Sequence, residues 1–256
     1  VLPSGYRNRR GLPHPLERNP VPRTKIQAIA VLATVLGIAA PAAENRKGEP
    51  MSTEDAKFVA LRQKAARRKR RIILNNDGGD GLAKKAAGDT SALDVFLKQR
   101  TAALVGSQVD TIFYCTGWAF GTMLHRTKVA ENMLLREGAG YQDGVLKDLL
   151  DQGTDSLQVM VEFCRKNKIE VFWSMRMNDT HDAKNPLPRA KMKADHPEYL
   201  IGGGKKPKYG QWTAVNFGNA DVRELVYRYI EEVCTNYDVD GVEMDFFRHP
   251  VLFKSH

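Results

Sequence analysis

The sequence predicts an α/β fold, a parallel (β/α) barrel of the TIM type of which the first four strands are present. Short apolar runs alternate with amphipathic helical patterns from residue 71 onward, beginning with a strand. Each apolar run ends in polar residues and a loop, which is typical of a barrel with an elaborated carboxyl-terminal face. The polar run 75–80 lacks the G-x-G-x-x-G spacing of a dinucleotide-binding loop, so a doubly wound sheet is less favoured.

Four strands and three helices account for this pattern. Ser91 and Asn219 are expected to cap the first and third helices, because serine and asparagine are common N-caps. A closed barrel of this type needs eight strands, so residues 71–256 are interpreted as the amino-terminal half of one. The expected strands are 71–77, 109–117, 169–179 and 238–250, and the expected helices are 91–105, 146–167 and 220–237.

Residues 1–43 have the pattern of a leader with a secretory signal peptide. Arg23 and Lys25 precede an uncharged run, 26–40, and the small residues at 40–43 offer a cleavage site. The run of about 15 residues is shorter than the roughly 20 that cross a bilayer. We therefore expect an exported protein, periplasmic or secreted, with no stable membrane insertion beyond this segment. The alternative is an uncleaved membrane anchor.

Residues 44–70 are expected to form a solvated, charged linker or helix, which continues into the basic run 67–71. The net charge of +9 arises here and in the leader, because the chain from Ile72 onward has 23 Lys and Arg against 25 Asp and Glu. A nucleic-acid-binding groove would place its basic residues on the folded domain. No nucleic-acid partner is therefore expected, with a polyanion-binding patch at 67–71 as the alternative.

The stretch 238–250 contains the strongest candidates for chemistry. Successive side chains of a strand point to opposite faces, so Glu243 and Asp245 share one face, opposite Val242 and Met244. A carboxylate pair on an apolar strand is costly to bury unless it is paired or used. Parallel barrels collect their chemistry at the carboxyl ends of the strands, so Asp245 and Glu243 are the candidate catalytic residues. A structural Asp that caps a helix or pairs with Arg is the alternative.

The third expected strand adds polar side chains at the same end. Arg176 is expected to pair with Asp245 or Glu243 on the neighbouring strand, which would lower the pKa of that carboxyl group. A purely structural ion pair is the alternative for Arg176. The further candidates for substrate binding are Asn178, His181, Asp77, His249 and the loop aromatic Trp212, although an aromatic near a strand is more often part of the core.

No metal or other cofactor is expected. His181, His249 and Asp245 have no spacing typical of metal ligands. The three cysteines, at positions 115, 164 and 234, are widely spaced and odd in number, so they indicate small buried side chains and no disulfide or metal framework.

Four runs in order resemble a bacterial glycosyl-hydrolase-like group near glycoside hydrolase family ten. The resemblance covers roughly residues 71–250 and implies a carbohydrate substrate. It assigns the acid/base or nucleophile to Asp245, with Glu243 as second choice. In the resulting hypothesis Arg176, Asn178 and His181 position the substrate, helped by loop aromatics. The runs are WSMRMNDTHD at 173–182, HPEYL at 196–200, AVNFGNADVR at 214–223 and VDGVEMDFFR at 239–248.

One element of such a site is missing. Glycoside hydrolysis uses two carboxyl groups that flank the bond, whereas Glu243 and Asp245 lie along one strand, about 6.5–7 Å apart by backbone rise. The partner in related barrels comes from a later strand. The alternatives are therefore a non-catalytic carbohydrate-binding barrel, a metal-dependent hydrolase or isomerase using His181, His249 and Asp245, and a truncated gene fragment without activity.

Overall fold

The computed structural model describes residues 52–135 and 144–254. The expected signal segment and the first part of the linker lie outside these ranges. Within them, none of the helices has both the length and the apolar character that crossing a membrane requires.

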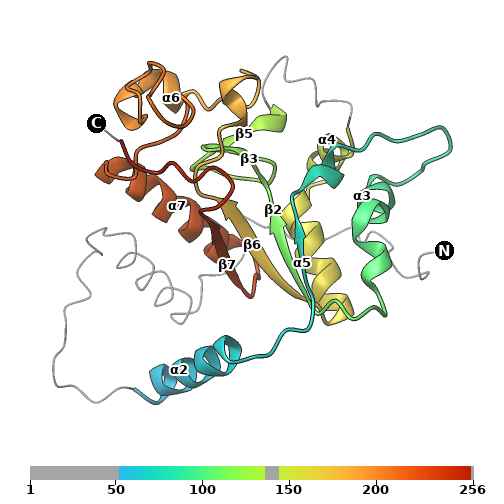
Figure 1. Ribbon diagram of the computed structural model, residues 1–256. Helices are drawn as coiled ribbons and strands as arrows, with labels where there is room; N and C mark the ends of the chain where they lie inside the picture. The colour runs from blue at the N-terminus through green and yellow to red at the C-terminus, as the bar shows by residue number, and fades with distance from the viewer. Residues whose placement is uncertain (1–51, 136–143, 255–256) are drawn as a thin grey trace.

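The core of the structure is a sheet of four parallel strands in chain order, which confirms that part of the prediction (Figure 1). β1 and β7 form its two edges. The described residues therefore make an open α/β sheet of four strands, the number that the sequence predicted for the amino-terminal half of a barrel. A closed barrel, which needs eight strands, is not formed by them. The strands are β1 (Ile73–Asn76), β2 (Thr111–Cys115), β6 (Glu170–Arg176) and β7 (Gly241–Asp245).

Helices join successive strands, as parallel pairing requires. α3 (Ala92–Arg100) follows β1, and its N-cap is Ser91, whose side chain accepts from the Asp94 N–H. α7 (Ala220–Asn236) precedes β7, with Asn219 as its N-cap. Both predicted caps are confirmed.

The predicted single helix 146–167 is wrong, because the structure has two helices there. α4 (Val145–Asp151) ends before Gly153, which adopts the left-handed conformation with φ 85°. Asp155 then caps α5 (Ser156–Asn167) by accepting from the backbone N–H groups of Leu157 and Gln158. The apolar spacing continues across this break, which is why the pattern alone suggested one helix.

A second, small sheet follows β2, in the order β3, β4, β5. The sequence predicts no strand there, because two or three residues give no alternation to detect. These strands are β3 (Gly117–Ala119), β4 (Thr122–Met123) and β5 (Glu131–Asn132). The remaining elements are α2 (Thr53–Ala66), η2 (Gly79–Leu82), η3 (Ala102–Leu104), η4 (Met133–Leu135), η5 (His181–Ala183), α6 (Met192–Asp195) and η6 (Pro197–Tyr199).

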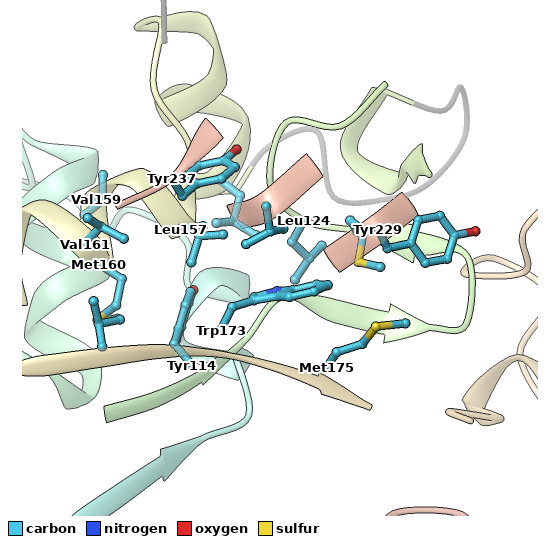
Figure 2. Close-up of a cluster of buried hydrophobic side chains, with 14 of the residues drawn as sticks. Tyr114, Leu124, Leu157, Val159, Met160, Val161, Trp173, Met175, Tyr229 and Tyr237 are labelled. Carbon is cyan, nitrogen blue, oxygen red and sulfur yellow. The ribbon is translucent and has the colours of Figure 1, made fainter. Parts of the chain in front are cut away.

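One face of the main sheet is covered by helices. Tyr114 of β2 and Trp173 of β6 are neighbours in the register, and both side chains are fully buried. Figure 2 shows them directed toward Leu157 of α5 and Tyr237 at the end of α7. Burying each such side chain contributes about 1.5–3 kcal/mol, so this face fixes the orientation of both central strands.

The opposite face is open and concave. Phe113 and Phe172 are only partly buried there, and Ile73 is 45% exposed. Asn75 on β1 donates to Glu243 on β7 at 3.4 Å, although two strands lie between them. A flat sheet would separate these edges by about 14 Å, at about 4.8 Å per strand. The sheet must therefore curl toward this face, as a segment of a barrel does.

The amino-terminal edge of the sheet is anchored to the segment before β1. Glu170 is 7% exposed and accepts from Arg70 Nε at 2.5 Å and from Thr111 Oγ1 at 3.0 Å. Arg68 lies 3.3 Å from the other carboxylate oxygen. α2 buries no residue, as expected of a solvated helix. The basic run that follows it, however, contributes Arg68 and Arg70 to the folded unit.

Replacing Asp155 by Ala should destabilise the fold strongly. The buried carboxylate also accepts from the Arg126 N–H at 3.2 Å and from Tyr237 Oη at 2.7 Å. Its removal leaves three backbone N–H groups without their acceptor, whereas Tyr237 Oη can still donate to Arg126 O. We expect a loss of roughly 3 kcal/mol or more in the free energy of urea unfolding. Ser91→Ala, which removes only the N-cap of α3, should cost about 1 kcal/mol. Equal losses in the two variants would contradict this interpretation.

Candidate active site at the carboxyl edge of the sheet

The four parallel strands end at one edge, where the loops meet. Figure 1 shows the small sheet and α6 beyond this edge. Asp77 follows β1, Arg176 ends β6 and Asp245 ends β7, and in the register Arg176 lies beside Asp245. The carboxyl ends of parallel strands are where α/β enzymes assemble their sites, so this edge is the candidate active site.

Asp77 is held as a carboxylate. Burial would raise its pKa, but this effect is outweighed by the hydrogen bond from the Gly79 N–H (3.1 Å), the contact with Arg100 and the charge of Arg176. The net result is a pKa below the ordinary value. Asp77 is therefore an ionised hydrogen-bond acceptor at neutral pH.

Arg176 pairs with a residue that was not its predicted partner. Its guanidinium lies 3.1 Å from Asp179 Oδ2, whereas Asp245 and Glu243 were the expected partners. The turn after β6 places Asp179, which is 1% exposed, directly beside the Arg176 side chain. The ion pair thus joins the end of β6 to the turn that follows it, and it does not link β6 to β7.

Asp179 also orients His181. Its Oδ1 accepts from the His181 backbone N–H at 2.9 Å and lies 2.6 Å from His181 Nδ1. His181 Nε2 lies 3.3 Å from Arg248 Nη2. A guanidinium can only donate, so Nε2 must accept and Nδ1 carries the proton. The His181 side chain is 42% exposed, which leaves it accessible at the edge.

His249 completes this group. Its ring lies edge-on to that of His181, with centroids 5.4 Å apart, and its Nδ1 accepts from the Thr180 N–H at 3.4 Å. Burial lowers the pKa of His249, and the charges of His181, Arg248 and Arg176 act in the same direction against Asp179. His249 is therefore neutral at pH 7.

Asp245 is fixed through one oxygen. Its Oδ1 accepts from the N–H groups of Phe247 (2.9 Å) and Arg248 (3.2 Å), a turn that aspartate commonly makes. Its Oδ2 has no hydrogen bond within residues 52–135 and 144–254. Glu243 lies one layer below and contacts Asn75. Among the described residues, Asp245 thus has a free oxygen at the edge, as does Asp77, whose hydrogen bonds from Gly79 and Arg100 both go to Oδ1.

Two other predicted residues contact protein groups. Asn178 is buried, its amide donating to Val215 O (3.0 Å) and Val251 O (2.7 Å) and accepting from the Val215 N–H (2.8 Å). Trp212 is partly buried, with the Arg189 guanidinium 4.5 Å from the centre of its ring. Asn178 therefore holds the loops around the site, and Arg189 covers one face of the indole.

Sequence reasoning did not select Asp179, Arg248 or the Lys193–Asp182 ion pair. Lys193 Nζ lies 2.7 Å from Asp182 Oδ2, with both side chains fully buried, and burial lowers the pKa of Lys193. This pair joins α6 to η5 beside the site. The only signal for Asp179 was its position two residues before His181. Among the described residues, no group of three or more His, Cys, Asp or Glu is arranged to hold a metal ion.

The comparisons with known proteins give the class to which this sheet and its polar edge belong. The family model described as "Glycosyl hydrolase-like 10" matches residues 92–254. The chain belongs to this family, which confirms the resemblance found in the sequence.

A curated relative is more distant. The protein named glycosyl hydrolase YngK, from Bacillus subtilis (strain 168), is 29% identical over 103 residues, which cover 39% of this chain and 19% of the relative. The matched segment therefore spans about a fifth of the length of that relative.

The environment of His249 predicts a pH dependence of stability. Its folded-state pKa is lowered from the ordinary 6.5, so below about pH 6.5 the unfolded chain binds a proton at His249 more strongly than the folded chain does. The free energy of unfolding therefore decreases as the pH is lowered. His249→Gln removes this share. On going from pH 7.5 to pH 5.5, we expect the wild type to lose more unfolding free energy than the His249→Gln variant, as measured by urea unfolding. A difference that is constant with pH would contradict it.

Proposed function

We propose that this protein hydrolyses a glycosidic bond of an oligosaccharide or polysaccharide by carboxylate acid/base chemistry. The observation that carries the proposal is the state of Asp245. One of its oxygens is fixed by the Phe247 and Arg248 N–H groups and the other is open at the edge of the sheet. Membership of the glycosyl hydrolase-like 10 family supports the same reaction class.

In this proposal Asp245 acts as the acid/base or the nucleophile. As an acid, it gives its proton to the glycosidic oxygen while positive charge develops on the sugar ring. The two backbone N–H groups hold the side chain in one orientation, which lowers the entropy cost of reaching the transition state. Glu243 remains the second choice, because it lies deeper and contacts Asn75.

Substrate hydroxyl groups would be bound by the side chains around Asp245. Asp77 offers an ionised acceptor, His181 an accessible imidazole and His249 a neutral one. Arg176 would act through Asp179, with which it pairs. Trp212 packs against the core and under Arg189, and it would offer a sugar ring the exposed part of its indole. Asn178 would act indirectly by holding the loops.

A non-catalytic carbohydrate-binding protein is the second candidate. Asp77 and Asp179, at the ends of β1 and β6, are each paired with an arginine, so neither of these carboxylates matches the unpaired state of Asp245. Saturable binding of glycans without any release of reducing ends would favour this candidate over the hydrolase.

Replacing Asp245 by Asn should remove turnover and keep the fold. General acid catalysis contributes about 10²–10⁴-fold, so kcat measured by reducing-end release from a panel of glycans should fall by at least about 100-fold. The thermal unfolding midpoint should stay close to that of wild type. Asp151→Asn, a change at the exposed end of α4, is the matched control and should leave kcat unchanged. Unchanged kcat in the Asp245 variant would contradict the assigned role.

We also propose that the protein is exported by the segment 23–43. The order of basic residues, apolar run and small residues supports this. Expression of the full chain in a bacterial host should give a periplasmic or extracellular product whose amino terminus, determined by sequencing, begins just after residues 40–43. An uncleaved chain in the membrane fraction would indicate an anchor instead.

A further inference from the structure

Hydrolysis needs a second group besides Asp245, and the carboxylates at the ends of β1 and β6 are each paired with an arginine, which keeps them from acting as a strong base. Asp77 is paired with Arg100, Asp179 with Arg176, and Glu243 lies along the same strand as Asp245. Attack by water requires a base on the other side of the bond. The accessible imidazole at this edge is therefore the group to consider.

His181 has the arrangement of an oriented base. The buried Asp179 carboxylate holds its Nδ1–H at 2.6 Å, which leaves the lone pair of Nε2 directed outward. A carboxylate in this position fixes the tautomer of an imidazole and stabilises the imidazolium that forms when Nε2 takes a proton. Arg248 now donates to Nε2 by a single hydrogen bond of 3.3 Å from an exposed side chain, so it can be displaced by a ligand.

Asp245 and His181 are also connected through shared neighbours. The Arg248 backbone N–H donates to Asp245 Oδ1, and the Arg248 side chain reaches His181 Nε2. Arg176 lies beside Asp245 in the register and pairs with the same Asp179 that holds His181. The two groups are thus linked through one residue on each side.

We propose that His181 is the base that activates the attacking water, with Asp179 as its positioning residue, so that the reaction inverts the anomeric carbon. The proposal rests on the proposed function. Water gives a proton to His181 Nε2 as its oxygen bonds to the anomeric carbon. The bond from that carbon to the leaving oxygen breaks, and the leaving oxygen takes the proton of Asp245. His181 ends protonated and Asp245 ionised, and proton exchange with solvent restores both.

The decisive variants are His181→Asn and His181→Gln. Asparagine keeps a donor near the Nδ1 position and loses the acceptor at Nε2, whereas glutamine keeps a polar group near Nε2 that has no basic nitrogen. Both should lower kcat by about 10²–10⁴-fold, remove the acidic limb of the pH–rate profile and change KM little. Asp179→Asn should lower kcat less and shift His181 toward the Nε2–H tautomer, read from ¹⁵N chemical shifts.

The matched control is a second histidine–carboxylate pair. His196 Nδ1 lies 2.9 Å from Glu198 Oε1 on the exposed η6 turn, with the same two-residue separation as Asp179 and His181. His196→Asn should leave kcat and the pH profile unchanged, which separates the site from a general effect of losing a histidine.

The outcomes distinguish this proposal from the function on which it rests. Product of inverted configuration by ¹H NMR, together with loss of kcat in both His181 variants, supports it. Retained configuration, kcat within twofold of wild type in His181→Asn, or an Nε2–H tautomer in the wild type overturns it. If turnover is lost in Asp245→Asn and kept in His181→Asn, the hydrolase proposal stands and this one falls. A wild-type chain without turnover overturns both.

Discussion

The burial of one face of β2 and β6 against α5 and α7 determines where every polar side chain of the sheet lies. Once Tyr114 and Trp173 point toward the helices, the alternation of a strand sends Ser174 and Arg176 to the other face. Because paired residues of neighbouring strands face the same side, Asp245 of β7, which lies beside Arg176 in the register, also points to that face. A slip of one residue would expose the aromatic side chains, so hydrophobic packing on one face holds the site in place on the other.

The fold was predictable where local signals and burial agree. Apolar runs gave the four strands in their order, and Ser91 and Asn219 marked helix starts because their side chains satisfy exposed N–H groups. The break at Gly153 was missed because apolar spacing continues through it. The contact between Asn75 and Glu243, from which the curl of the sheet is inferred, was not predictable because the two residues are far apart in the chain.

The location of the site was easier to predict than its contacts. Polar residues after parallel strands must gather at one edge, so the place follows from the order of the strands. The choice of Asp179 over Asp245 as partner of Arg176 depends on the turn after β6, which the sequence does not specify. In the same way, the sequence cannot distinguish an amide that binds backbone groups, as Asn178 does, from one that faces a ligand.

The edge position of β7 has a consequence for the precision of the site. Within the described residues β7 pairs on one side only, with β6, and Gly241 packs so closely on the Phe172 ring that an added Cβ would lie 2.4 Å from it. Strands with one neighbour open locally at a lower free energy than those with two, so amide hydrogens of β7 should exchange before those of β2 and β6. Asp245 thus lies on one of the two edge strands, which are less protected than β2 and β6. Any strand that paired with the outer side of β7 would restrict the motion of Asp245. The positional precision of this carboxylate therefore depends on what occupies that edge.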